Sequence, residues 1–270
     1  MKKWCSLIFV LLMTSAQAQT IGFMQIPSRA GVKQPFLYSK AASPVAVAIL
    51  FPGGGGRIGA AGSAENGWAR ESSFLSGGAR RFTDNGITAA VFETPSDKGD
   101  LNGGYRNTPE HNQDVAALIA FLRKDNPGLP IWLVGVSNGP LSATSAAANL
   151  GKMGPDGIVL TSSVSVEHII SGQRNAHPYW AAKLNQIEVP VLIVHHKNDG
   201  CSHTPYEAMQ KSLPSFTKAP KTHLITMEGG SARGNPCADG YHLYVGIEAE
   251  TTKQIADWIK ANLNSSQGKN

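Results

Sequence analysis

The feature that most constrains this chain is a Gly-x-Ser-x-Gly pentapeptide at residues 135–139, because of the sequence on either side of it. The apolar residues 130–134 predict a buried strand, and the small residues 141–148 predict a helix. A turn that leads directly from a strand into a helix is so tight that a Cβ at either flanking position would clash with backbone, and glycine removes that clash. The pattern therefore predicts a strained turn that presents the Ser137 hydroxyl at the carboxyl end of a strand.

Length and composition favour a single globular domain. The chain has 270 residues, of which 41% are hydrophobic and 16% are charged, and these values are typical of a globular protein rather than a disordered one. The Gly-rich and Pro-rich stretches are short and lie between apolar runs, so they indicate loops and not interdomain linkers. We interpret residues 19–270 as one α/β domain.

Residues 1–18 have the pattern of an export signal. Two lysines precede an apolar run at residues 4–13, and an Ala-x-Ala cleavage site ends the segment at Ala18. A membrane anchor is the alternative, but the apolar run is too short to span a bilayer comfortably. We therefore expect a mature protein that begins at Gln19, lies in a bacterial periplasm or outside the cell, and has no stable membrane anchor.

Removal of this segment changes both the net charge and the cysteine count. The net charge falls from +5 to +3 because two lysines and no acidic residues are lost. This mild positive charge favours solubility and does not indicate a nucleic-acid partner. Cys5 is also lost, which leaves Cys201 and Cys237. An even pair in an oxidising compartment predicts a disulfide, and two separate buried thiols are the alternative.

Apolar runs alternate with amphipathic segments along the rest of the chain. The predicted strands lie at residues 46–51, 87–93, 130–134, 158–162, 189–194 and 223–227, and the predicted helices at 68–84, 114–122, 141–148 and 247–263. Strands that are apolar throughout and alternate with helices are typical of a parallel sheet covered on both faces. Functional groups in such sheets gather in the loops at the carboxyl ends of the strands. This places the glycine-rich residues 53–56, Ser137 and the loop after Val194 together.

Ser137 can act as a nucleophile only if a base accepts its proton and an acid orients that base. The chain supplies candidates in the order serine, acid, histidine. Asp199 lies just past the fifth predicted strand, and His242 follows the last strand, immediately before the C-terminal helix. The rival acids are Glu228 and Asp239, and Asp199 is otherwise explained as a turn residue.

Four other histidines compete with His242 for the role of base. His223 begins a predicted strand and His195 lies in or near one, so packing is the better explanation for both. His196 and His203 flank the candidate acid and are the stronger competitors, as residues that line the pocket. His242 itself has the alternative of being a packed or solvent-exposed histidine.

From Pro44 to Leu263 the chain resembles the α/β-hydrolase-fold serine hydrolases. The matching segments are Phe51-Pro52-Gly53-Gly54-Gly55-Gly56, Gly135-Val136-Ser137-Asn138-Gly139, Val194-His195-His196-Lys197-Asn198-Asp199 and Tyr241-His242. The resemblance implies that Ser137 is the nucleophile, His242 the general base and acid, and Asp199 the orienting carboxylate. It also implies a mostly parallel central sheet with helices on both faces.

The same resemblance gives the glycine run a role. A tetrahedral intermediate carries negative charge on the substrate oxygen, and two preorganised backbone N–H groups must point at that oxygen. One would come from Asn138 and the other from Gly54 or Gly55. The chain has Pro52 where the His-Gly-Gly-Gly pattern of lipases and esterases has histidine, so the choice of donor stays open. A nucleotide-phosphate loop is disfavoured because no Gly-Lys-Ser/Thr follows.

The two cysteines fit this arrangement. Cys201 lies two residues after Asp199, and Cys237 lies five residues before His242, so a bridge would join the acid loop to the histidine loop. Closing a loop of that size stabilises a protein by roughly 3–4 kcal/mol on the chain-entropy model.

The substrate side is less clearly defined by the sequence. Residues 166–186 are the best candidate for a small cap, in which Tyr179 and Trp180 would line an acyl or alcohol pocket or would simply pack. Residues 94–108 form a second candidate wall. Histidines and acids lack a convincing metal-ligand spacing, and we expect neither a metal nor another cofactor.

These observations predict an exported hydrolase that cleaves a small-molecule or acyl ester through an acyl-enzyme. A peptidase, amidase or acyltransferase on the same three residues is the first alternative. A non-catalytic binding protein of the same fold is the second, and the complete set of Ser137, Asp199 and His242 argues against it.

Overall fold

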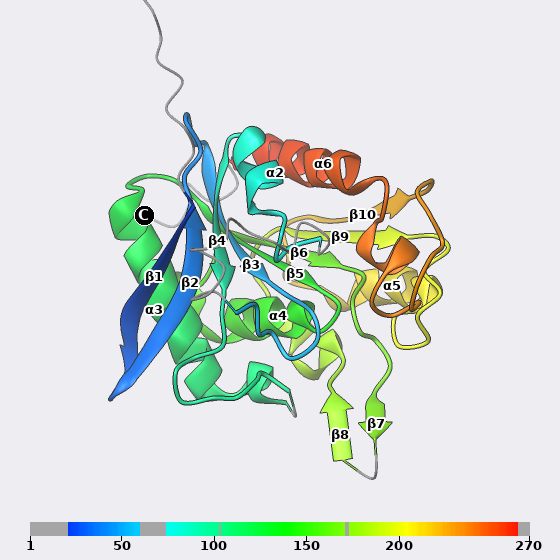
Figure 1. Cartoon of the computed structure of the whole chain (residues 1–270), viewed down its shortest axis with the longest axis horizontal. Coiled ribbons are helices and arrows are strands. Elements are labelled where there is room, and N and C mark those ends of the chain that lie inside the picture. Colours follow the sequence, from blue (N-terminus) through cyan, green and yellow to red (C-terminus); the bar gives the residue numbers. More distant parts are fainter. Residues whose placement is uncertain (1–20, 60–73, 103, 171–172, 264–270) are drawn as a thin grey trace, which may run out of the picture.

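A computed structural model describes residues 21–59, 74–102, 104–170 and 173–263 of the chain (Figure 1). The predicted export signal at residues 1–18 lies outside the described residues. No helix in the described ranges is long and apolar enough to cross a membrane.

Eight strands form one sheet in the order β1-β2-β4-β3-β5-β6-β9-β10. They are β1 (Ile21–Arg29), β2 (Val32–Ser39), β3 (Ala46–Phe51), β4 (Ile87–Phe92), β5 (Ile131–Val136), β6 (Gly157–Thr161), β9 (Val191–His196) and β10 (Thr222–Met227). The six strands from β4 to β10 in this order are parallel, whereas β2 runs antiparallel to both β1 and β4. The predicted mostly parallel α/β sheet is confirmed.

Helices cover both faces of this sheet (Figure 1). The α-helices are α2 (Ala79–Asp84), α3 (Pro109–Asp125), α4 (Gly139–Asn149), α5 (Tyr206–Ser212) and α6 (Glu248–Ala261). The short 3-10 helices are η1 (Tyr105–Asn107), η2 (Gly151–Met153), η3 (Tyr179–Ala181), η4 (Leu184–Gln186), η5 (Leu213–Ser215) and η6 (Gly240–Leu243). Buried side chains of α3, α4 and α5 belong to one core, and those of α2 and α6 belong to the other.

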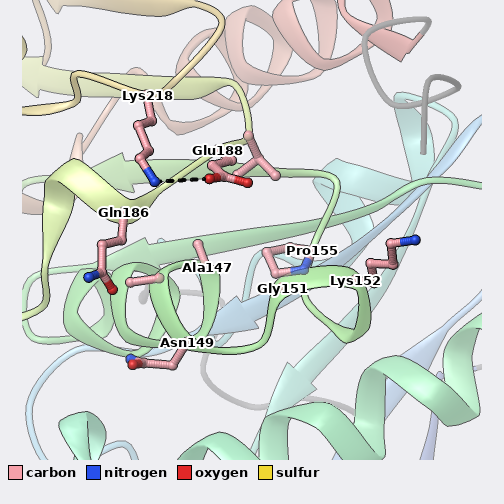
Figure 2. Close-up of a pocket in the computed structure, with 10 residues that line it drawn as sticks. Ala147, Asn149, Gly151, Lys152, Pro155, Gln186, Glu188 and Lys218 are labelled. Carbon is pink, nitrogen blue, oxygen red and sulfur yellow. Dashed lines mark hydrogen bonds and ion pairs between the residues drawn. The ribbon is translucent and has the colours of Figure 1, made fainter.

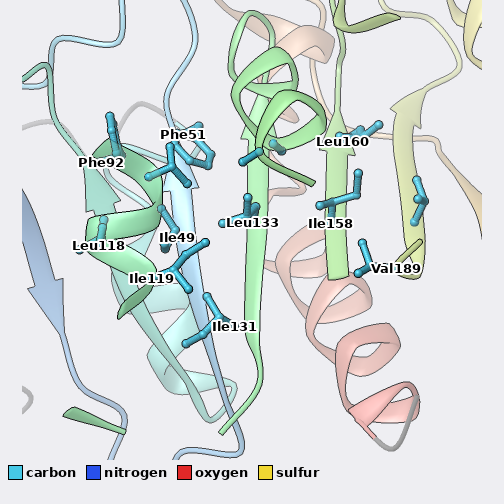
Figure 3. Packing of buried hydrophobic residues seen from close by; sticks show 14 of the residues in the cluster. Ile49, Phe51, Phe92, Leu118, Ile119, Ile131, Leu133, Ile158, Leu160 and Val189 are labelled. Atoms are coloured by element: carbon cyan, nitrogen blue, oxygen red, sulfur yellow. The ribbon is translucent and has the colours of Figure 1, made fainter. Parts of the chain in front are cut away.

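Alternate residues of each central strand lie in the two different cores. In β3, Ile49 and Phe51 pack on the side of α3 and α4 (Figure 3), whereas Ala48 and Leu50 pack on the side of α2 and α6. All six residues of β3 are buried. A strand that faces a core on both sides must be apolar at every position, which is why these strands are uninterrupted apolar runs in the sequence.

The structure confirms the six predicted strands, with boundaries that move by at most two residues. The helix predicted at 114–122 is longer because Thr108 caps its start, where its hydroxyl accepts from the His111 N–H at 3.2 Å. Of the helix predicted at 68–84, residues 68–73 lie outside the described residues, and α2 begins only at Ala79. The strands β1 and β2 were not predicted, because polar residues and a proline interrupt each of them.

A small hairpin projects from the body of the fold after β6 (Figure 1). It consists of β7 (His168–Ile170) and β8 (Gln173–Ala176), which pair antiparallel. The hairpin and the helices η3 and η4 lie within residues 166–186, the segment predicted as a small cap.

Candidate active site

Ser137 lies on a tight turn between β5 and α4. Its φ of 59° is in the left-handed region, which non-glycine residues rarely adopt. A Cβ at Gly135 would lie 2.4 Å from the carbonyl carbon of Gly139, and a Cβ at Gly139 would lie 2.2 Å from the carbonyl oxygen of Phe51. Both glycines are therefore required by the backbone around Ser137, as the pentapeptide predicted.

Asp199 and His242 meet across the loops that follow β9 and β10. The Nδ1 of His242 donates to Oδ2 of Asp199 at 3.0 Å, and both side chains are fully buried. This leaves Nε2 of His242, which is also buried and hydrogen-bonds to none of the described residues, Ser137 included. A histidine whose Nδ1–H is fixed by a carboxylate presents an unprotonated Nε2, which is the form that accepts a proton.

The Asp199 carboxylate receives more hydrogen bonds than the one from His242. The backbone N–H of Cys201 donates to Oδ1 at 3.0 Å, the hydroxyl of Thr204 donates to Oδ2 at 2.9 Å, and Nε2 of His195 lies 3.3 Å from Oδ2. Burial by itself raises the pKa of the carboxyl group, but the bonds from His195, His242 and Cys201 outweigh it and hold the pKa of Asp199 well below its usual range. The aspartate is therefore charged at neutral pH.

The end of β6 connects the serine turn to the histidine loop. The backbone N–H of Ser137 donates to the carbonyl oxygen of Thr161 at 3.1 Å. The hydroxyl of the next residue, Ser162, donates to the carbonyl oxygen of His242 at 2.7 Å. Ser162 is fully buried and has a positive φ of 40°. Neighbouring residues at one strand end thus hold both Ser137 and His242.

Two of the competing histidines, His196 and His223, have surroundings that separate them from Asp199. His196 accepts from the Asn198 N–H at Nδ1 (3.0 Å), so its Nε2 donates to the Gly229 carbonyl (2.9 Å), and its ring stacks on that of Tyr241. Both of its nitrogens are therefore engaged with backbone. His223 is exposed on β10.

The competing acids are bound to other partners. Glu228 is exposed and pairs with Lys197 at 3.1 Å. Asp239 caps the start of η6 by accepting from the Gly240 N–H at 2.8 Å, and it lies 3.6 Å from Arg233. Within the described part of the chain, neither carboxylate is bonded to a histidine.

The glycine run after β3 packs directly on Ser137. A Cβ at Gly53 would lie 2.9 Å from the Cβ of Ser137, so only glycine fits there. The side-chain amide of Asn138 donates to the Gly54 carbonyl oxygen at 3.2 Å, which joins the run to the start of α4. Among the described residues, the backbone N–H groups of Gly54, Gly55 and Asn138 donate to no backbone acceptor.

Comparison with known proteins identifies the fold. No protein-family model and no curated protein matches the chain. Among solved structures, Est1E from Butyrivibrio proteoclasticus superposes with a TM-score of 0.60, at 16% identity over 90% of this chain and 99% of that chain. XC6422 from Xanthomonas campestris, described as an α/β serine hydrolase without lid, gives 0.57 at 16% identity over 90% and 95%. The Pyrococcus furiosus esterase PF2001 gives 0.64 at 13% identity over 90% and 92%. The chain has the α/β-hydrolase fold.

One disulfide joins two loops of this α/β-hydrolase fold. Cys201 and Cys237 are bonded across 36 residues of sequence, as the sequence analysis predicted. The backbone N–H of Cys201 also donates to the Asp199 carboxylate, so one end of the bridge is bonded directly to Asp199. It therefore connects the Asp199 loop covalently to the segment that precedes His242.

We expect reduction of this disulfide to lower stability and, through Asp199, activity. Loss of the cross-link should cost about 3–4 kcal/mol in the free energy of unfolding. Thermal unfolding with and without reductant measures the first effect, and ester turnover measures the second. The intact mass of the untreated protein should be two hydrogen atoms below that of the reduced protein. Rapid alkylation of both Cys201 and Cys237 in unreduced, native protein would contradict the bridge.

The two aromatic residues proposed for substrate binding have different surroundings. Tyr179 is 1% exposed and belongs to the core on the α3 and α4 side, which corresponds to the packing alternative. Trp180 is 49% exposed, and its Nε1 donates to the Ser165 carbonyl oxygen at 2.9 Å. The backbone N–H of Val164 donates to the Ser137 carbonyl oxygen at 3.0 Å. Trp180 is therefore held on the segment that packs beside Ser137.

A cavity of about 580 Å³ lies elsewhere, between the end of α4 and the start of β9 (Figure 2). Its rim contains an ion pair of Lys218 and Glu188 at 3.2 Å, and both side chains are more than half exposed. Neither Ser137 nor His242 lines it. The cavity is thus at the amino ends of the strands and is separate from the candidate site. Among the described residues no group of His, Cys, Asp or Glu side chains could hold a metal ion.

Proposed function

We propose that this protein is a serine hydrolase that cleaves carboxylic esters, with Ser137 as nucleophile, His242 as base and Asp199 as orienting acid. The observation that carries the proposal is the 3.0 Å bond from His242 Nδ1 to a buried, charged Asp199, which leaves Nε2 unengaged. Ser137 contributes a strained turn of the kind that exposes a nucleophile. The esterases and serine hydrolases among the structural neighbours support the same class of reaction.

In this mechanism His242 Nε2 accepts the hydroxyl proton while Ser137 Oγ attacks the ester carbonyl carbon. The electron pair of the C=O bond moves to oxygen, and the N–H of Asn138 with that of Gly54 or Gly55 stabilises the resulting anion. The start of α4 adds favourable dipole charge at this place. His242 then returns the proton to the leaving alcohol, which produces an acyl-serine. Water repeats the sequence and releases the carboxylic acid.

The bond between Ser137 Oγ and His242 Nε2 must form for this reaction to begin. Such bonds are often long in the absence of substrate and tighten when the substrate binds. Asp199 stays charged throughout and stabilises the imidazolium that forms on His242.

A fluorophosphonate probe and a substrate panel test the proposal. The mature chain, residues 19–270, is incubated with the probe and separately with p-nitrophenyl esters and aminoacyl amides. We expect labelling at Ser137 and turnover of the esters. Labelling of Ser137 combined with turnover of amides alone would make the protein an amidase or peptidase, and the absence of both labelling and turnover would overturn the proposal.

We propose that Trp180 contributes to the site for a small-molecule substrate. Ferulic acid is bound to Est1E in one of the neighbouring structures. Trp180 is exposed and bound to Ser165, one residue from the contact that Val164 makes with Ser137, and it offers an apolar surface for a group of that size. Trp180→Ala should raise KM for aromatic acyl esters by roughly tenfold and should leave p-nitrophenyl acetate nearly unaffected. Met153→Ala is the control, because Met153 is also exposed but lies in η2. Equal KM values for Trp180→Ala and the wild type would show that Trp180 does not bind the substrate.

We also propose that the protein is exported, with residues 1–18 as the cleaved signal. The disulfide between Cys201 and Cys237 is compatible with an oxidising compartment. N-terminal sequencing of the protein recovered from the periplasm or medium should begin at Gln19. Retention of Met1 in protein recovered from the cytoplasm would contradict export.

A further inference from the structure

Arg106 is a buried cation beneath the glycine run, and the mechanism above does not use it. It lies in η1 and is 2% exposed. It forms no ion pair within the described part of the chain. Burial lowers the pKa of Arg106 to about 9, with the charge of Asp100 acting in the opposite direction. Burying a charge without a paired carboxylate costs free energy of folding. This cost points to a functional reason for an arginine at position 106.

The guanidinium of Arg106 binds backbone carbonyls of the glycine run. Its Nη2 donates to the carbonyl oxygens of Pro52 at 3.0 Å and Gly54 at 3.2 Å. Its Nη1 donates to the hydroxyl of Ser142 at 2.9 Å, which lies on α4. One side chain thus connects the run to the helix that begins beside the candidate nucleophile.

These contacts fix the direction of particular N–H groups. In a trans peptide the C=O and the following N–H point in opposite directions. Because the Gly54 carbonyl points at Arg106, the N–H of Gly55 points away from it. The Gly54 carbonyl also accepts from the side chain of Asn138, so this peptide plane is held by two donors. The Gly53 carbonyl, by contrast, accepts from the Gly56 N–H within a turn of the run.

We propose that Arg106 is a positioning residue that presents the N–H of Gly55 as the second donor to the oxyanion. This inference rests on the proposed hydrolase function. Donation from a cation to the Gly54 carbonyl polarises the peptide group and makes its N–H a stronger donor. The positive charge also favours the negative charge that develops on the substrate oxygen, since water does not screen it. Both effects act on the transition state and little on the bound ester.

Kinetics of Arg106 variants test this inference. In Arg106→Met we expect kcat for p-nitrophenyl esters to fall about 10²-fold, the cost of losing one oxyanion donor, while KM changes less than about threefold. The rate constant for fluorophosphonate labelling should fall by a similar factor. Arg106→Lys keeps the positive charge but loses the paired Nη1 and Nη2 donors. Its kcat should lie between that of Arg106→Met and that of the wild type.

Arg57→Met is the matched control. Arg57 follows the same run, but it is exposed and donates to the Gly99 carbonyl instead. It should retain near wild-type kcat. Unchanged kcat in Arg106→Met would overturn the inference. The inference would also be overturned if a smaller fraction of the Arg106→Met protein were labelled while the labelling rate constant of that fraction stayed at the wild-type value. That result would mean that Arg106 acts in folding alone.

A measurement that does not depend on activity separates this inference from the proposed function. Hydrogen exchange of peptides that cover residues 53–56 should be faster in Arg106→Lys and Ser142→Ala than in Arg57→Met. If the wild type neither labels nor turns over esters, the proposed function fails, and exchange still decides whether Arg106 holds the run. Equal exchange in all variants would overturn the positioning role itself.

Discussion

Ser137→Ala should abolish fluorophosphonate labelling and lower ester turnover by on the order of 10⁴-fold or more, the loss expected when a serine hydrolase loses its nucleophile. The physical reason is that no other hydroxyl sits on a strained turn between a strand and a helix N-terminus in the described part of the structure. Alanine removes only the oxygen, so the glycines on either side keep the turn and the fold should persist. Circular dichroism and thermal unfolding check that the variant is folded.

Ser202→Ala is the matched control for this experiment. Ser202 is an exposed serine in the loop that also contains the candidate acid, so its loss tests whether a serine near the site is enough. The Ser202→Ala variant should be labelled by the probe and should turn over esters as the wild type does. Labelling that persists at another serine in Ser137→Ala would contradict the assignment.

The central fold was predictable because its signals are local in sequence. Strands such as β3 are buried on both faces, so they stand out as apolar runs. The turn at Ser137 was predictable for the same reason, since two glycines within five residues fulfil a steric need that the structure confirms. The edge strand β1 carries no such signal: it is half-buried, it pairs with β2 alone among the described strands, and polar residues interrupt it.

The surroundings of the site depended on contacts that the sequence does not encode locally. His195 was explained as a packing residue, yet its Nε2 lies 3.3 Å from Asp199. Thr204 donates to the same carboxylate, and nothing in the sequence distinguishes it from other threonines in loops. Arg106 reaches the glycine run from 52 residues away in sequence. Tyr179 packs in the core on the side of α3 and α4, a long-range contact that its neighbours in sequence do not indicate.

Asp199 has consequences for how the reaction depends on pH. Its pKa is lowered in the folded protein, so the carboxylate contributes stability above its unfolded pKa, and that contribution is lost only as the pH falls through the lower folded value. The aspartate therefore remains charged in mild acid.

His242→Ala should lower kcat about as severely as Ser137→Ala, on the order of 10⁴-fold. Among the described residues, His242 has the only imidazole ring that is bonded to Asp199 through Nδ1 and has no hydrogen-bond partner at Nε2. Asp199→Ala should cost less, since the aspartate orients the imidazole and stabilises its charged form but transfers no proton. Ester turnover of the three variants, measured beside the wild type, makes this comparison.

His196→Ala and His203→Ala are the controls, because these two histidines flank Asp199 in sequence. His196 uses one ring nitrogen on the backbone of Asn198 in its own loop and the other on the Gly229 carbonyl in the loop after β10, so its loss should loosen these two loops without removing the candidate base. The backbone carbonyl of His203 accepts from Ser165 and Val166, a contact that an alanine would keep. Both variants should retain far more activity than His242→Ala. Near wild-type turnover in His242→Ala, with a collapse in His196→Ala or His203→Ala, would show that the base had been assigned to the wrong histidine.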